Sequence, residues 1–132
     1  MARDERHPTD AELAVLRRLW QRGTATVREL RDDLYPDGGH AHHATVQSLL
    51  DRLEEKRCVR RRKDGRVNRY ASTVTRADLV VRRLRDTADA LCDGSLAPLL
   101  SHLVENVELS EDEARTLEQL IDRLDRERGG AS

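Results

Sequence analysis

Phenylalanine is absent from this chain of 132 residues, and isoleucine, tryptophan and tyrosine together supply only four positions. Leucine supplies 19 positions, so any core must be built mainly from leucine. Hydrophobic residues make up 37% of the chain, which can bury a small core but is thin for a large single sheet. The length fits one domain, or a small domain with a helical appendage.

Long apolar runs are also missing. No stretch approaches the ~18 apolar residues that a transmembrane helix needs, so the sequence predicts no membrane span. The first 20 residues are charged and have no apolar core, which argues against a secretory signal. Cys58 and Cys92 are too few for a disulfide framework or a paired zinc motif. These absences together predict a cytoplasmic protein.

Motifs for catalysis are missing too. The sequence has no Gly-rich phosphate loop, no nucleophile motif and no paired metal-binding carboxylates. We therefore predict that the protein is not an enzyme and that it uses no metal and no cofactor.

Charge, by contrast, is abundant and unevenly distributed along the chain. The net charge of −1 conceals a surplus of +4 in residues 1–75 and of −5 in residues 76–132. A basic front half and an acidic back half indicate a division of labour along the chain.

Local capping signals predict the first helices. Thr9-Asp10-Ala11-Glu12 and Thr26-Val27-Arg28-Glu29 both read as capping boxes. Gly23 is expected to end the first helix, and Pro36 the second. A third helix is predicted over 43–57, because apolar residues recur there at helical spacing.

The hydrophobic period changes after the third helix. Residues 58–63 and 66–71 read as two strands, with Asp64-Gly65 between them. Asp-Gly in that place is a strong signal for a type I′ hairpin turn, which needs a positive φ at both positions. In the resulting register Val59 faces Tyr70, and Arg60 lies opposite Arg69.

The remainder is predicted to be helical. One helix covers 75–92 and is broken by Gly94, and Ser95 caps the next. A third capping box at 110–113 opens the last helix, and the tail over 129–132 is predicted to be disordered.

Three helices followed by a basic hairpin is the arrangement of a winged helix-turn-helix domain. The predicted fold is mainly α with a small β-hairpin. It places a winged helix-turn-helix DNA-binding domain at 1–74 and a C-terminal helical dimerisation domain at 75–128.

The basic residues gather on the predicted wing. Segment 52–69 has a surplus of six positive charges. Like charges directly opposite destabilise a hairpin, so a sequence that keeps Arg60 opposite Arg69 gains from a polyanion. A solvated hairpin with nothing bound is the alternative, but the preceding helix-turn-helix pattern favours DNA.

Helix 43–57 is the predicted recognition helix. Gln47 is suited to bidentate contact with adenine N6 and N7, and the methyl of Thr45 is suited to thymine. No Arg or Lys lies in the first two turns, so phosphate contacts should supply much of the affinity, and a weak monomer would need dimerisation. The predicted DNA-binding residues are His43, Ala44, Thr45, Gln47, Ser48, Arg52, Arg60, Arg62, Lys63, Arg66 and Arg69.

Two leucine-rich stripes in the acidic half would sit poorly on the surface of a monomer. They either pack against the winged helix or each other, or they form a dimer interface. We predict the interface, made by Leu96, Leu99, Leu100, Leu103, Val104, Val107, Leu117, Leu120, Ile121 and Leu124.

The order of these motifs resembles a known family. The resemblance rests on the following motifs: Thr45-Val46-x-x-Leu49-Leu50-x-Arg52-Leu53-x-x-Lys56, then Gly65-Arg66 and Tyr70, and later Gly94-Ser95, Leu99-Leu100, Val104-Glu105 and Leu109-Ser110-x-Asp112-Glu113. From about residue 9 to 124 the chain is similar to the penicillinase-repressor family, of the BlaI and MecI type. The resemblance implies a homodimeric repressor on a palindromic double-stranded DNA operator, with interlocked C-terminal helices. It also implies that Thr45, Gln47 and Ser48 contact bases and phosphates.

Two positions depart from that family. Arg57 stands where relatives usually have glycine after the recognition helix, which puts a non-glycine residue in a left-handed position. Characterised penicillinase repressors are cleaved at an Asn-Phe bond, and the corresponding residues here are His102 and Leu103. The resemblance thus implies control of a β-lactam or cell-wall-stress response, relieved by a membrane sensor protease or a co-acting protease. Because His102 and Leu103 differ from Asn and Phe, the sequence leaves open whether the chain is cleaved at this bond.

Other readings remain for the histidines and cysteines. His40, His42 and His43 lie beside the recognition helix, but no cysteine or carboxylate joins them in an obvious zinc spacing. A solvated or phosphate-touching role is favoured for them, and a small buried hydrophobe for each cysteine. The alternative functions are a metal- or redox-responsive winged-helix repressor and a winged-helix module that binds protein instead of DNA.

Overall fold

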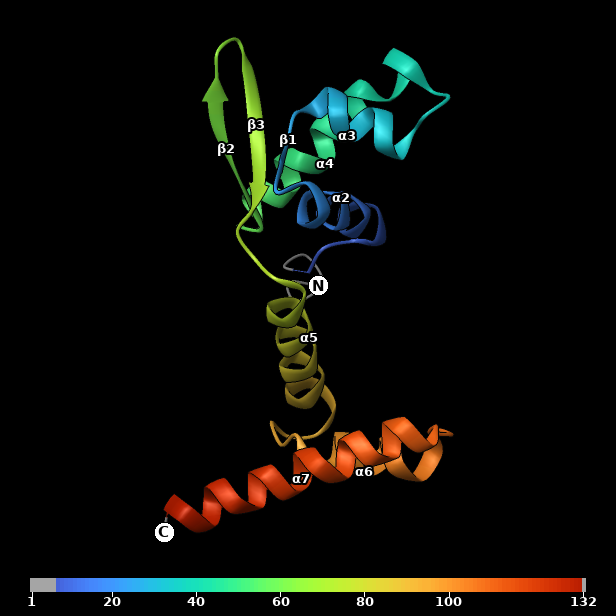
Figure 1. The fold of residues 1–132 in the computed structure, drawn as a ribbon, viewed down its shortest axis with the longest axis vertical. Coiled ribbons are helices and arrows are strands. Elements are labelled where there is room, and N and C mark those ends of the chain that lie inside the picture. The colour runs from blue at the N-terminus through green and yellow to red at the C-terminus, as the bar shows by residue number, and fades with distance from the viewer. Residues whose placement is uncertain (1–6, 132) are drawn as a thin grey trace. The chain divides into compact units, whose positions relative to one another are not determined.

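The computed structural model describes residues 7–131, and the chain forms two compact units with the boundary between Asp86 and Thr87. The order of elements confirms the predicted winged helix-turn-helix, in which a short strand follows the first helix (Figure 1). The first unit contains α2 (Asp10–Arg22), β1 (Thr24–Ala25), α3 (Val27–Leu34), the 3-10 helix η1 (Gly39–His42), α4 (His43–Glu55), β2 (Val59–Asp64), β3 (Val67–Ser72) and the start of α5 (Arg76–Leu91).

The predicted caps of the first two helices are confirmed. Thr9 and Glu12 exchange hydrogen bonds between side chain and backbone at the start of α2, and Thr26 and Glu29 do the same at α3. Gly23 ends α2 with a φ of 83°, a conformation that glycine adopts at little cost. Each cap satisfies backbone N–H groups that a helix start leaves without partners.

The three strands form an antiparallel sheet in the order β1-β3-β2, and the hairpin register differs from the predicted one. Arg62 lies opposite Arg69, where the sequence placed Arg60. Val59 is likewise not paired with Tyr70 but with a residue nearer the end of β3. The pairing is therefore shifted by two residues, which keeps every side chain on its predicted face.

The turn explains the shift. β2 continues through Asp64, so the two turn residues are Gly65 and Arg66. Of these two, only Gly65 has a positive φ, of 66°. Glycine at the first central position with no positive φ at the second is the requirement of a type II′ turn, whereas type I′ needs both.

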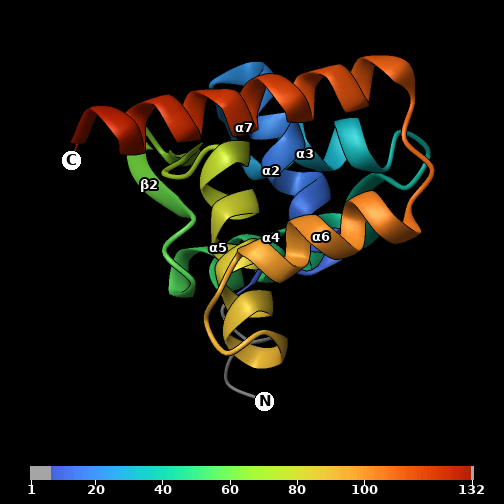
Figure 2. The same cartoon turned by 90° about the horizontal axis from the view of Figure 1, so that it is seen from below.

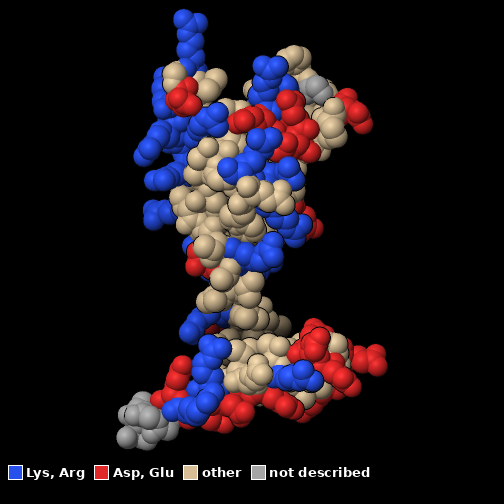
Figure 3. All heavy atoms as spheres, viewed as in Figure 1, with Lys and Arg blue, Asp and Glu red and all other residues tan. Residues whose placement is uncertain are grey.

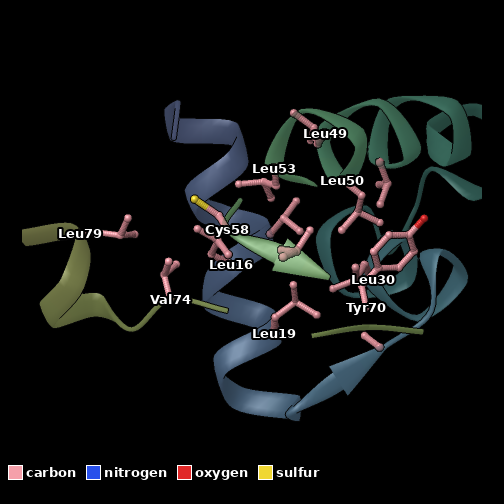
Figure 4. Packing of buried hydrophobic residues seen from close by; sticks show 14 residues of the cluster. Leu16, Leu19, Leu30, Leu49, Leu50, Leu53, Cys58, Tyr70, Val74 and Leu79 are labelled. Carbon is pink, nitrogen blue, oxygen red and sulfur yellow. The ribbon is translucent and has the colours of Figure 1, made fainter. Parts of the chain in front are cut away.

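Leucine side chains from three helices form the core of the first unit (Figure 4). Leu16, Leu30 and Leu50 have no exposed surface and pack with Tyr70 of β3. Burial of each such leucine contributes about 1.5–3 kcal/mol to folding. Trp20 lies at the margin of this core, and its indole N–H donates to the carbonyl oxygen of Val74 at 2.9 Å.

A buried ion pair fixes the end of α4. Lys56, the C-cap of α4, donates to Glu12 Oε1 at 2.6 Å and to the carbonyl oxygen of His7 at 2.9 Å. The Glu12 side chain is almost fully buried, and a carboxylate is tolerated there because a cation pairs with it. α4 is thereby held to α2 by charge as well as by leucine packing.

The first unit extends beyond the domain boundary predicted at 74. Leu79 of α5 belongs to the core, and Arg83 donates to the carbonyl oxygen of Pro8 at 3.0 Å. His7 and Asp86 contact each other at 2.6 Å. α5 begins with a capping box that was not predicted from the sequence, in which Thr75 and Asp78 exchange hydrogen bonds.

The second unit contains α6 (Ala97–Asn106) and α7 (Glu111–Ala131), which Figure 2 shows as two separate helices joined by a loop. The predicted cap of α6 is wrong: Leu96 is the N-cap, and no side chain caps it. The predicted capping box of Ser110 and Glu113 is confirmed. α7 continues through the glycines at 129 and 130, where a disordered tail was predicted, and Ser132 lies outside the described residues.

The apolar stripes of the second unit are not covered. α6 has no buried residue, and Leu100, Val104 and Ile121 are 41%, 57% and 44% exposed. Among the described residues, no helix is long and apolar enough to cross a membrane.

Candidate nucleic-acid interface

α4 presents one face to the core and the other to solvent. Val46, Leu50 and Leu53 have no exposed surface, and their spacing fixes the rotation of the helix. The predicted DNA-binding residues on the opposite face are exposed, namely His43, Ala44, Thr45, Ser48 and Arg52. α4 therefore offers a row of side chains that a groove of DNA can reach.

Gln47 differs from its neighbours on that face, because it is only half-exposed and its amide is engaged. Its Nε2 donates to Asp51 Oδ1 at 3.0 Å and to the Tyr70 hydroxyl at 3.1 Å. A carboxylate only accepts hydrogen bonds, so the atom that faces Asp51 must be the amide nitrogen. Both amide hydrogens are used, and a base would meet the carbonyl oxygen Oε1. This arrangement does not support the predicted bidentate contact with adenine.

The wing presents the cations that the sequence predicted, with one exception. Figure 3 shows Lys and Arg side chains gathered along the β2–β3 hairpin. Arg60, Arg62, Lys63 and Arg66 are exposed, and none of them forms an ion pair with a described residue. Four cations in one hairpin form a strong positive patch, which favours a polyanionic ligand.

Arg69 is the exception. It donates to Asp64 at 2.9 Å and to Glu29 at 3.3 Å, and its side chain is partly buried. These two acids offset the repulsion between Arg69 and Arg62 across the strands. Arg69 therefore connects the hairpin to α3, and it is poorly placed for the phosphate contact that was predicted.

The carboxylate of Glu29 is central to that connection. The backbone N–H of Thr26 donates to it, and Arg69 and Arg22 lie nearby, so the pKa of Glu29 is lowered. On the neighbouring turn, the Arg22 guanidinium donates to Asp33 and lowers the pKa of that carboxyl. Both acids stay charged and hold α2, α3 and the hairpin together.

The segment that leads into α4 is ordered by stacking. The rings of Tyr35 and His42 are parallel, with centroids 4.0 Å apart. A Cβ at Gly38 would collide with His42 Cδ2, so a larger residue there would displace the His42 ring from its stack on Tyr35. His40 contacts the buried guanidinium of Arg31 at 3.3 Å. Among the described residues, no group of three or more His, Cys, Asp or Glu side chains could hold a metal ion.

The two cysteines occupy different environments. Cys58 is fully buried, and burial raises the pKa of its thiol, so the reactive thiolate is disfavoured. Cys92 is half-buried at the end of α5. Cys58 is thus a small core residue, as predicted, and Cys92 is less buried than predicted.

Comparison with known proteins now identifies the family. A family model described as "Penicillinase repressor" matches residues 8–123. The chain belongs to the penicillinase repressor family. The transcriptional regulator BlaI of Mycobacterium tuberculosis is 36% identical over 118 residues, which cover 88% of this chain and 83% of that protein. The penicillinase repressor of Bacillus licheniformis is 25% identical over 114 residues, which cover 86% of this chain and 88% of that protein.

Other relatives carry similar names. The methicillin resistance regulatory protein MecI of Staphylococcus aureus is 23% identical over 115 residues, covering 87% of this chain and 93% of that protein. Among solved structures, a mutant of MarR from E. coli complexed with operator DNA matches with a TM-score of 0.44 and 24% identity, over 88% of this chain and 74% of that chain. The penicillinase repressor family is one of transcriptional regulators, which agrees with a DNA-binding repressor and not with an enzyme.

The departures from the family are visible in the structure. Arg57 has a φ of 60°, so it occupies the left-handed conformation at a cost on the order of 1 kcal/mol. Its carbonyl accepts from the Thr73 hydroxyl at 2.8 Å, which holds this strained position next to the end of the hairpin. His102 and Leu103 lie inside α6, with His102 exposed and Leu103 half-buried.

Proposed function

We propose that this penicillinase repressor family member represses transcription as a homodimer on a palindromic operator. The observation that carries the proposal is the combination of an exposed α4 face with an adjacent hairpin of four cations without ion pairs among the described residues. The α4 face suits the major groove, and the cations suit the flanking phosphates.

The two parts of this surface have separate roles in the proposal. Thr45, Gln47 and Ser48 read bases and nearby phosphates, while Arg60, Arg62 and Arg66 hold the backbone. The α4 face has few charges of its own, so readout by one subunit is weak. Two subunits on a palindrome double the base contacts, which supplies the specificity that a single subunit lacks.

Dimerisation uses the exposed stripes of α6 and α7. Exposed apolar patches of this kind mark interaction sites on soluble proteins. The surrounding acidic residues repel DNA, so the stripes suit contact with a second copy better than contact with the operator. The proposed interface contains Leu96, Leu99, Leu100, Leu103, Val104, Val107, Leu117, Leu120, Ile121 and Leu124.

Selection of bound sequences from a random DNA pool tests the operator. We expect an inverted repeat whose half-site centres are one helical turn, about 10–10.5 base pairs, apart or a multiple of that spacing. The chain should form a dimer when its size is measured by sedimentation. Recovery of single, unrepeated sites by a monomeric protein would contradict both halves of the proposal.

We also propose that repression is relieved by cleavage near the bond between His102 and Leu103. This bond divides the apolar stripe of α6, so its cleavage would remove part of the dimer interface while leaving the first unit intact. Chain cleaved at a protease site engineered there should sediment as a monomer and lose operator affinity. If the cleaved chain remains a dimer with unchanged operator affinity, relief does not act through this bond.

A further inference from the structure

An apolar pocket lies in the first unit, away from the proposed DNA surface. It has a volume of about 330 Å³ and lies between α2 and the first part of α5. The apolar side chains that line it are Leu13, Trp20, Leu79, Val80 and Leu84. Its size is at the lower end of the range for small-molecule sites. In Figure 1 the start of α5 and the hairpin tip lie at opposite ends of this unit.

The wall of the pocket is held rigidly. Trp20 donates through Nε1 to the carbonyl oxygen of Val74 at 2.9 Å and to the Ser72 hydroxyl at 3.1 Å. These two hydrogen bonds fix the indole ring, with its N–H edge directed toward Ser72 and Val74. Val80 and Leu84, by contrast, are 49% and 48% exposed, so the pocket presents apolar surface that nothing described in this unit covers.

The charge around the pocket has one sign. Arg17, Arg76 and Arg83 line it, and none of the described lining residues is acidic. Arg83 donates to the carbonyl oxygen of Pro8 at 3.0 Å, and Arg76 lies 5.7 Å from the centre of the Trp20 ring. Arg17 and Arg76 form no ion pair with a described residue. A ligand that fits must therefore be apolar at one end and anionic at the other.

We propose that this pocket binds a small amphipathic organic carboxylate. The apolar body would lie against Trp20, Leu79 and Leu84, and the carboxylate would pair with Arg17 and Arg76. A guanidinium matches a carboxylate with two parallel hydrogen bonds. A DNA phosphate would satisfy the arginines but has no group to fill the apolar wall. The site is independent of the proposed operator contacts, because it shares no residue with them.

The single tryptophan of the chain provides a direct measurement. Full-length protein would be titrated with cyclohexanecarboxylate while the emission of Trp20 is recorded, since this probe does not absorb where tryptophan is excited. Cyclohexylmethanol serves as the uncharged match, and inorganic phosphate as the anion without an apolar body. We expect a saturable change with the carboxylate, and affinity at least about tenfold weaker for the other two, because each lacks one half of the recognition.

Substitutions test whether Arg17 and Arg76 are the residues that bind the carboxylate. Arg17→Gln and Arg76→Gln should each weaken carboxylate binding about three- to tenfold, the effect of one lost charge-assisted contact at an exposed site. Arg28→Gln is the matched control, because Arg28 is an exposed arginine of α3 that does not line the pocket. Equal losses in all three variants would show a general charge effect and overturn the site.

The remaining outcomes also decide the proposal. A flat titration, or equal binding of the alcohol or of phosphate, would overturn the amphipathic carboxylate as the ligand class. A second copy of the chain is the competing occupant of the exposed Val80 and Leu84 surface. If apparent affinity for the carboxylate falls as protein concentration rises through the dimerisation range, the partner fills the pocket and the proposal is wrong.

Discussion

Gln47 shows how a hydrogen-bond inventory limits what one residue can read. Asp51 and the Tyr70 hydroxyl take both amide hydrogens, so Oε1 is the group that remains for a base edge. In the major groove, an acceptor of this kind selects the exocyclic amine of adenine or cytosine. Tyr70 belongs to strand β3 of the hairpin, so the hairpin orients a side chain on the exposed face of α4.

We therefore predict that Gln47→Ala weakens operator binding by about 0.5–1.5 kcal/mol, the contribution of one neutral hydrogen bond. Binding to scrambled DNA should change little, because no charge is removed. Competition titration at one salt concentration, with operator and scrambled duplexes, measures both effects. An operator-to-scrambled ratio within a factor of two of the wild type would mean that Gln47 does not read a base.

Tyr70→Phe tests the orientation itself. The phenyl ring keeps the core filled, but one amide hydrogen of Gln47 is released toward DNA. We expect the preference for adenine or cytosine at the contacted position to relax, while the salt dependence of binding stays unchanged. Titration of four operators that differ only at that base pair would show this. An unchanged base preference would indicate that Tyr70 has no positioning role.

At the scale of elements, the hairpin contains two kinds of cation: some form ion pairs with described residues, and others form none. Arg60→Ala, Arg62→Ala or Arg66→Ala should each weaken binding to operator and random DNA alike. Each change should flatten the slope of log K against log[salt] by about 0.9, the contribution of one phosphate contact. Arg69→Ala is the matched control, because Asp64 and Glu29 already neutralise Arg69. A slope that changes as much in this control as in the others would contradict the assignment.

We predict that the contact between α2 and α3 makes the stability of the fold sensitive to acid. Hydrogen bonds and charge lower the pKa of Asp33, from an ordinary value of 3.8, and of Glu29, from 4.5. A lowered pKa contributes stability that is fully present above the ordinary value and is lost as the pH falls through the lowered one. The free energy of unfolding should therefore decline as the pH falls below about 4.5.

Urea unfolding across that range measures this decline. Asp33→Asn should flatten the pH dependence and lower stability at neutral pH, because the ion pair with Arg22 is lost. Asp37→Asn is the control, since Asp37 is an exposed aspartate in the loop after α3. If both variants follow the wild-type profile, Asp33 does not contribute to acid sensitivity.

The same elements show which features a sequence can predict. The capping boxes of α2, α3 and α7 were predicted correctly because each follows the local pattern of Ser or Thr with Glu three residues later, whereas the box at α5 has Asp78 in place of glutamate and was not predicted. The hairpin was found but its register was not, since Asp64-Gly65 and Gly65-Arg66 both suit a two-residue turn. The hydrogen bonds from Arg69 to Glu29 and from Gln47 to Tyr70 were not predicted, because the partners are 40 and 23 residues apart in the chain, respectively. Contacts of that range depend on the fold, so local patterns do not reveal them.

At the scale of the whole molecule, the two units differ in how fully their apolar residues are buried. The first unit has a closed leucine core, whereas α6 has no buried residue and its stripe faces solvent. The two halves also differ in charge, +4 over residues 1–75 and −5 over residues 76–132. In the proposed repressor the basic half would bind phosphates, and the acidic half, which would carry the dimer interface, would repel them.

Leu100→Asp tests the dimer interface without disturbing a core. Leu100 is 41% exposed, so an aspartate there costs the single chain little, but it would place an unpaired charge in the proposed interface. Sedimentation should show a shift toward monomer. Operator affinity should fall by roughly 100- to 10,000-fold, because the linked binding of two half-sites is lost. Random DNA, bound through the wing, should keep its salt slope.

Ser101→Asp is the matched control, because it adds the same charge at the next position of α6. Residue 101 is exposed and lies off the apolar stripe, so this variant should remain dimeric and keep operator affinity. Monomer formation by both variants would point to charge repulsion in α6 as a whole. A dimer that survives Leu100→Asp, with operator affinity intact, would mean that the two copies associate through another surface.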